Sequence, residues 1–226
     1  MSLQATHKRA LVVGGTGRVG RAIADRLAGE EWLVLATGRG DGDIRTSAGA
    51  AAVVARAELE LGGLDLVVHA AGAGFKPQPV EEVTEADWDE ALDVTAKGTF
   101  FLAQAAAPAL RASRGVFLVI EDVASFQPWP SFAPHAAAKA AQAMLTRVLA
   151  RALAPEVRVV GLAPGPVAVE PEQEERRAQE TLLQRIGTVQ DVADAVVYLA
   201  GASYVTGTTL VVDGGRLAKS GGRPNA

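Results

Sequence analysis

Cysteine is absent from this 226-residue chain, and aromatic residues make up only 5% of it. The lack of cysteine excludes disulfides, thiolate metal sites and cysteine nucleophiles. No run of about 18 uncharged apolar residues is present, so we expect no membrane span. Segment 1–9 lacks the apolar core of a signal peptide, and no basic stretch resembles a nucleic-acid footprint. These absences predict a cytoplasmic protein with no membrane or nucleic-acid partner.

Small aliphatic residues must fill the core, because hydrophobic residues make up 49% of the chain and aromatic ones are few. The length suits a single α/β domain. We therefore expect one domain over residues 1–226, with an ordered core over about 8–216 and frayed ends.

Short apolar runs alternate with segments of helical spacing along the chain. The runs predicted as buried strands are residues 10–13, 32–36, 64–69, 116–120, 157–162 and 208–212. The predicted helices are residues 18–27, 47–61, about 84–110, 134–153 and 189–199. Apolar strands that alternate with helices are typical of a parallel sheet covered on both faces. The predicted fold class is thus α/β, a single-domain doubly wound parallel sheet of Rossmann type.

Local signals indicate where two of these helices begin and where a long loop lies. Ser47 is a plausible N-cap for its helix, and Thr84 with Asp87 forms a capping-box pattern. Segment 164–177 is rich in proline and glutamate. We predict a loop there, either a solvated surface loop or a mobile lid over a substrate.

A G-x-G-x-x-G motif follows the first predicted strand and opens the first helix. Its glycines allow a sharp turn and a close approach of the backbone to a pyrophosphate, while the helix N-terminus offers free N–H groups. The sequence therefore predicts a dinucleotide site. The predicted phosphate-binding residues are Gly14, Gly15, Thr16, Gly17, Arg18, Val19 and Gly20.

The second predicted strand ends without the acidic residue that usually binds the ribose hydroxyls of NAD. Arg39 stands there instead, and a guanidinium can clasp a 2′-phosphate. This favours NADP(H) as cofactor, with NAD(H) the weaker prediction. The alternative is that Arg39 is simply exposed and Asp41 or Asp43 reaches the ribose.

From these features the chain resembles the short-chain dehydrogenase/reductase family along nearly its whole length. Residues 13–20 are similar to the family's T-G-x-x-x-G-x-G, with Arg18 at the middle glycine, a variant similar to that of pteridine reductases. Residues 69–72 resemble N-N-A-G, and 163–167 resemble the family's P-G segment. Residues 204–207 with 212–215 resemble its C-terminal signature.

The resemblance implies further cofactor contacts. Asp43 and Ile44 correspond to an Asp-aliphatic pair beside the adenine, and the unusually short segment before them implies that a helix is deleted. The other implied contacts are Ala70, Ala71, Gly72, Lys139, Pro164, Gly165 and Val167.

The family's catalytic set is altered here. That set has a tyrosine and a lysine spaced Y-x-x-x-K, a serine thirteen residues before the tyrosine, and an asparagine on an earlier helix. Lys139 is retained, but His135, Asp122 and Thr95 stand at the other three positions. The resemblance implies that Lys139 binds the nicotinamide ribose. Asp122 and the segment that follows it are similar to pteridine reductases, which keep the tyrosine.

Two functions follow from the altered set. An imidazole is a capable general acid near neutral pH, and an Asp–His pair can sustain its positive charge. Against this, an imidazole is shorter than a phenol, and Lys139 opposes the charging of His135. The first function is an NADP(H)-dependent oxidoreductase that reduces a carbonyl or pterin-like small molecule or oxidises an alcohol. The alternative is a catalytically degenerate dinucleotide-binding protein that acts as a sensor or partner subunit.

The resemblance also implies a homo-oligomer, either a dimer or a tetramer. Family members commonly associate through the helices that correspond to residues 84–110 and 134–153 here. We predict no metal site.

Overall fold

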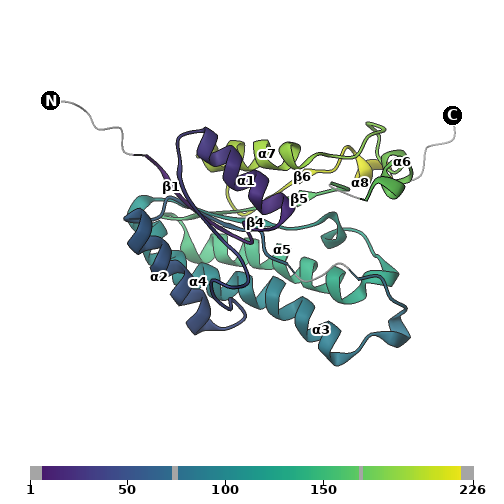
Figure 1. The fold of residues 1–226 in the computed structure, drawn as a ribbon, viewed down its shortest axis with the longest axis horizontal. Helices are drawn as coiled ribbons and strands as arrows, with labels where there is room; N and C mark the ends of the chain where they lie inside the picture. Colours follow the sequence, from purple (N-terminus) through teal and green to yellow (C-terminus); the bar gives the residue numbers. More distant parts are fainter. Residues whose placement is uncertain (1–6, 73–75, 168–169, 220–226) are drawn as a thin grey trace.

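The fold is built around a single parallel sheet of six strands. The computed structural model describes residues 7–72, 76–167 and 170–219. The strands lie in the order β2-β1-β3-β4-β5-β6, and each pairs in parallel with its neighbours (Figure 1). The fold prediction is confirmed. The strand bounds are β1 Arg9–Val13, β2 Leu33–Thr37, β3 Leu66–His69, β4 Val116–Ile120, β5 Arg158–Pro164 and β6 Thr209–Val212.

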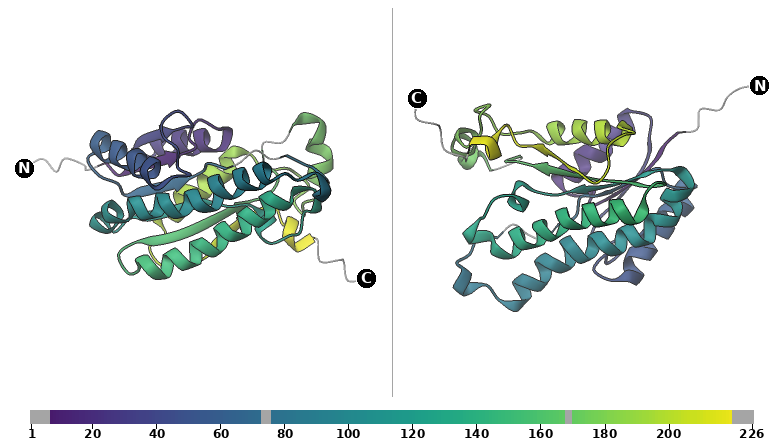
Figure 2. Two further views of the ribbon diagram at one scale, coloured as in Figure 1. Left: turned by 90° about the horizontal axis from the view of Figure 1, so that it is seen from below. Right: turned by 180° about the vertical axis from the view of Figure 1, so that it is seen from behind.

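Helices cover both faces of the sheet because neighbouring strand residues point to opposite faces. Leu11 joins a core with residues of α2, α4 and α5, whereas Val12 joins a core with residues of α1 and α7. Figures 1 and 2 show α1 and α7 on one face and the other three helices on the opposite face. These five helices are α1 Arg18–Gly29, α2 Ser47–Leu61, α4 Gly98–Ser113, α5 Ala133–Leu153 and α7 Val189–Gly201.

The predicted helix over 84–110 is interrupted. Helix α3 (Glu85–Leu92) runs into a π-helical turn, Asp93–Lys97, and α4 follows directly. The π turn contains Thr95, which is 1% exposed. Such turns are single-turn insertions that often occur at functional sites. The capping box of Thr84 and Asp87 that opens α3 is confirmed.

Two local predictions are wrong. The cap of α2 is Thr46, whose Oγ1 accepts a hydrogen bond from the N–H of Gly49 at 3.0 Å, and Ser47 is already helical. Segment 164–177 is not wholly a loop, because it contains most of helix α6, Pro171–Gln179. That helix lacks an apolar stripe, so the sequence gives no helical periodicity by which to predict it. Its acidic first turn and basic last turn stabilise it through the helix dipole instead.

The chain passes from β1 to the edge strand β2 on one side and then returns to β3 on the other side of β1. Ligands of open α/β sheets bind at such switch points, beyond the carboxyl ends of the strands. From β2 the chain passes in nine residues to α2, so β2 forms an edge of the described sheet. The short connection agrees with the implied deletion of a helix.

Candidate active site

A cavity of about 490 Å³ lies at the carboxyl ends of β1, β2 and β3. Its walls bring together the glycine loop, the segment after β2 and the segment after β3. Glu90 of α3 and Val94 of the π-helical turn that follows it also line the cavity. The predicted cofactor residues that line it are Gly14, Thr16, Gly17, Arg39, Asp43, Ile44, Ala70, Ala71 and Gly72.

The glycine loop is shaped by close backbone contacts. Gly14 has φ +86°, and a Cβ there would lie 2.5 Å from the amide nitrogen of Ala71. A Cβ on Gly20 would overlap the carbonyl of Gly14, and one on Gly15 would lie 2.7 Å from Ala36 Cβ. These three glycines therefore let the loop, helix α1 and the neighbouring strands approach one another.

Two other glycines keep the cavity open. A Cβ on Gly72 would meet no atom within 4 Å, and one on Gly17 would meet only the Gly14 carbonyl at 3.4 Å. Gly17 is the N-cap of α1, and no side chain caps this helix end. The first N–H groups of α1 thus face a space that a larger side chain would fill, which fits a bound phosphate.

The carboxylates near the end of β2 are held by their own partners. Asp41 accepts a hydrogen bond from the N–H of Gly38 at 2.7 Å and pairs with Arg56, and Asp43 pairs with Arg45 at 2.8 Å. These contacts hold the pKa of both carboxyls below the usual value, with the Gly38 N–H the largest cause for Asp41 and the Arg45 guanidinium the largest for Asp43.

Arg39 differs from the other charged groups at this edge. It is exposed, lines the cavity, and has no ion pair or side-chain hydrogen bond within the described part of the chain. The Arg39 guanidinium thus faces the cavity, while the two neighbouring carboxylates are already paired with other arginines.

The remaining predicted cofactor residues lie outside the wall of this cavity. Arg18 pairs with Glu170 at 3.4 Å, and Val19 packs on the core under α1 and α7. Pro164 ends β5, and the N–H of Gly165 donates to the Val212 carbonyl. Val167 pairs with Gly187 in an isolated bridge.

The structure brings Asp122 and His135 together, although they are thirteen positions apart in the chain. Asp122 follows β4 and caps a 3₁₀ turn, Val123–Ser125, by accepting the N–H of Ala124 at 2.7 Å. Its other oxygen lies 3.6 Å from His135 Nε2 in the first turn of α5. This is ion-pair range for a protonated imidazole but longer than a hydrogen bond.

Lys139 lies one turn further along α5 but points into the interior. Its side chain is buried, and Nζ donates to the Ile120 carbonyl at 2.8 Å and to Gln142 Oε1 at 3.0 Å. Burial lowers the pKa of Lys139, while the charges of Asp122 and Glu121 oppose that shift. Thr95 is buried nearby, and its carbonyl accepts the Gln142 amide at 3.2 Å. Gln142 gave no motif signal in the sequence.

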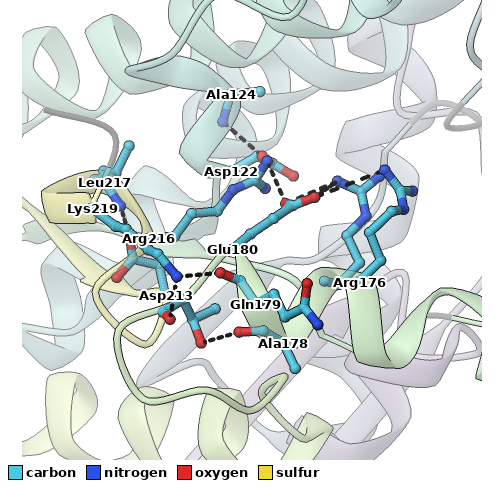
Figure 3. Close-up of polar contacts among 12 residues, drawn as sticks. Asp122, Ala124, Arg176, Ala178, Gln179, Glu180, Asp213, Arg216, Leu217 and Lys219 are labelled. Carbon is cyan, nitrogen blue, oxygen red and sulfur yellow. Dashed lines mark hydrogen bonds and ion pairs between the residues drawn. The ribbon is translucent and has the colours of Figure 1, made fainter. Parts of the chain in front are cut away.

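The C-terminal turn adds a residue that sequence analysis missed. Arg216 opens helix α8 (Arg216–Lys219), lies over the Trp129 ring at 4.8 Å and pairs with Glu180 at 3.0 Å. Figure 3 shows its side chain pointing toward Asp122 and Glu180. Its position near Asp122 depends entirely on tertiary structure, because the two are 94 positions apart in the chain.

Two negative findings concern the described residues. They contain no helix long and apolar enough to cross a membrane. They also contain no cluster of three or more histidine, aspartate or glutamate side chains suited to a metal ion.

Comparison with known proteins identifies the family. Residues 18–216 match the family model described as "Enoyl-(Acyl carrier protein) reductase". The chain is 31% identical over 242 residues to human "Dehydrogenase/reductase SDR family member 4", covering 92% of this chain and 87% of that protein. It is 34% identical to "3beta-hydroxysteroid dehydrogenase 1" of Eggerthella lenta, covering 92% and 93%.

Solved structures agree with this result. A 3-ketoacyl-(acyl-carrier-protein) reductase of Brucella melitensis, complexed with NADH, superposes with a TM-score of 0.86 at 27% identity, covering 94% of this chain and 99% of that one. The aldohexose dehydrogenase of Thermoplasma acidophilum gives 0.89 at 25% identity, covering 97% and 98%. The fold and site therefore define a dinucleotide-binding α/β protein. The chain belongs to the short-chain dehydrogenase/reductase family of oxidoreductases.

Proposed function

We propose that this protein is an NADP(H)-dependent oxidoreductase that reduces a carbonyl or pterin-like compound, or oxidises an alcohol. The observation that carries the cofactor choice is the charge at the end of β2. Arg39 faces the cavity without an intramolecular partner among the described residues, while Asp41 and Asp43 are held by Arg56 and Arg45. A 2′-phosphate supplies the missing partner, whereas a ribose hydroxyl does not need one.

The proposed chemistry uses the Asp122–His135 pair. A bound nicotinamide cofactor supplies or accepts the hydride. During reduction His135 donates a proton to the oxygen of a carbonyl substrate, or to the ring nitrogen of a pterin-like one. Asp122 stabilises the charged imidazole at 3.6 Å. Lys139 contributes a positive charge from its buried position. Arg216, which lies over the Trp129 ring, points toward Asp122 of this pair.

The experiment is a calorimetric titration of the purified protein with NADPH and NADH. We expect tighter binding of NADPH, and Arg39→Gln should weaken it about 10- to 100-fold while leaving NADH binding unchanged, because one charge-assisted phosphate contact is lost. Arg111→Gln, an exposed arginine on α4, is the matched control. Equal affinity for both cofactors in the wild type would overturn the NADP(H) assignment.

A second function is favoured by the position of Lys139. Because two of its donors are committed to Ile120 and Gln142, the protein could bind a dinucleotide without turnover, as a sensor or partner subunit. Steady NADPH oxidation with a panel of carbonyl and pterin compounds excludes this function. Loss of that activity in His135→Phe would assign the proton to His135.

We also propose a cytoplasmic homo-oligomer, a dimer or tetramer, that acts on a small molecule. Apolar side chains on two neighbouring helices support the assembly: Phe100 on α4 is 40% exposed, and Met144 and Val148 on α5 are 53% and 51% exposed. A second copy of the chain would cover them.

A further inference from the structure

Gln142 is a fully buried amide in the middle of α5, three residues after Lys139. Both ends of the amide are bound. Oε1 accepts from Lys139 Nζ at 3.0 Å, while Nε2 donates to the Thr95 carbonyl at 3.2 Å and to Thr99 Oγ1 at 2.9 Å. Gln142 thus links the lysine to the π-helical turn and the start of α4.

The orientation of this amide is fixed by its partners. The hydroxyl of Thr99 donates to the Thr95 carbonyl at 2.6 Å, so its oxygen accepts from Gln142 and from Nδ1 of His69, which lies 2.8 Å away. A reversed amide would place its NH₂ group against the Lys139 ammonium. Gln142 therefore presents its carbonyl oxygen to the lysine and no other atom.

The same contacts set the direction of the Lys139 ammonium. Two of its three N–H groups are used by Gln142 Oε1 and by the Ile120 carbonyl at 2.8 Å. The third has no partner in the described part of the chain. Because the N–H bonds of an ammonium diverge tetrahedrally, this third bond points away from both acceptors.

We propose that Gln142 is a positioning residue for Lys139. It holds one N–H bond of the ammonium in the protein interior, the Ile120 carbonyl holds a second, and the third is left for the active centre. The amide provides an acceptor without adding a negative charge to the core. The proposal rests on the proposed function only in one respect, namely that the third N–H bond serves an active centre. The hydrogen bond from Lys139 to Gln142 does not depend on whether the protein turns over a substrate.

The other ionisable groups around Lys139 are carboxylates and imidazoles from neighbouring elements. Glu121 and Asp122 follow β4 and act on the lysine through their negative charge. His69 ends β3, and burial together with the positive charge of Lys139 lowers the pKa of its imidazole. His135 lies one turn earlier on α5. A substitution at position 142 keeps all four of these side chains, and of the four only His69 shares a hydrogen-bond partner, Thr99 Oγ1, with the Gln142 side chain.

The test is an NMR titration of the free protein with isotope-labelled lysine side chains, compared among position-142 variants. Gln142→Met removes the acceptor, so we expect the pKa of Lys139 to fall further, by roughly 1–2 units. Gln142→Glu is isosteric and adds a negative charge, so we expect that pKa to rise. Gln104→Met, an exposed glutamine on α4, is the control and should change nothing.

Opposite shifts in the two variants support the proposal, because a role in packing alone would not reverse sign with the charge at position 142. A change of less than about 0.3 unit in both variants would overturn it. If Gln142→Met fails to fold, the isosteric Gln142→Glu carries the test.

A turnover assay separates this proposal from the proposed function. Opposite NMR shifts without turnover in any variant would uphold the role of Gln142 and remove the oxidoreductase function. Unchanged NMR titrations in variants of an active protein would support the oxidoreductase function and overturn the role of Gln142.

Discussion

His69 shows how a single buried side chain acquires a fixed charge state. It is 0% exposed, and Nδ1 donates to Thr99 Oγ1, which leaves Nε2 without a hydrogen-bond partner among the described residues. Burial, and then the positive charge of Lys139, lowers the pKa of His69 to about 3. The imidazole is therefore neutral in the folded protein at any pH near neutrality.

This charge state makes stability depend on pH. In the unfolded chain an imidazole titrates near pH 6.5, whereas the folded one binds a proton only near pH 3. The contribution is therefore complete above about pH 6.5 and is lost as the pH falls toward 3. Between pH 7 and pH 5 we expect a loss of about 2 kcal/mol, measured by urea unfolding at both pH values.

The variant His69→Asn should lack this part of the pH dependence, because it cannot take up the proton. His7→Asn is the matched control, since His7 is exposed. Equal losses of stability between pH 7 and pH 5 in the wild type and in His69→Asn would contradict the assignment.

Among the elements, α6 and the C-terminal turn are joined by an ion pair and by backbone hydrogen bonds. Glu180, just after α6, pairs with Arg216 of the C-terminal turn at 3.0 Å and locally with Arg177 at 3.2 Å. The Gly214 carbonyl accepts the N–H groups of Leu182 and Leu183, and Lys219 donates to the Thr181 carbonyl at 3.2 Å. These contacts fasten the segment that presents Arg216 near Asp122 (Figure 3).

We expect Arg216→Gln to loosen this junction. It removes the ion pair with Glu180 and the stacking on Trp129, together of order 1–1.5 kcal/mol at a partly buried site. Hydrogen exchange at the amides of Leu182 and Leu183 should therefore accelerate about tenfold. Arg26→Gln breaks an ion pair between α1 and α7, with Asp194, and one at the end of α1, with Glu30. It is the control and should leave both amides unchanged.

At the scale of the whole molecule, the exposed apolar side chains of α4 and α5 predict self-association. Val148→Lys places a charge in the middle of the proposed interface, so the oligomer should dissociate toward monomers. Light scattering at micromolar concentration measures the mass. Leu59→Lys, on α2 and 86% exposed, is the matched control and should preserve the assembly. A wild-type monomer in this measurement would contradict the proposed oligomer.

The sequence determined the order of strands and helices, the parallel sheet and the glycine loop at its switch point. These features depend on local patterns: apolar runs, helical spacing, and glycines that no larger residue could replace. The spacing of Asp122 and His135 was informative through the resemblance to the family's serine and tyrosine positions, and the structure places the two side chains 3.6 Å apart. Helix α6 escaped prediction because its charged surface carries no apolar period.

Only the tertiary structure decided where the charged side chains of the site point. The pairing of Asp41 with Arg56, the inward direction of Lys139 and the approach of Arg216 all depend on other elements of the fold. A long side chain has several rotamers of similar energy, and the hydrogen-bond acceptors and charges that other elements place around it select one of them. Gln142 is the plainest case, since its side chain joins Lys139 on its own helix to Thr95 and Thr99, which lie more than 40 residues earlier in the chain.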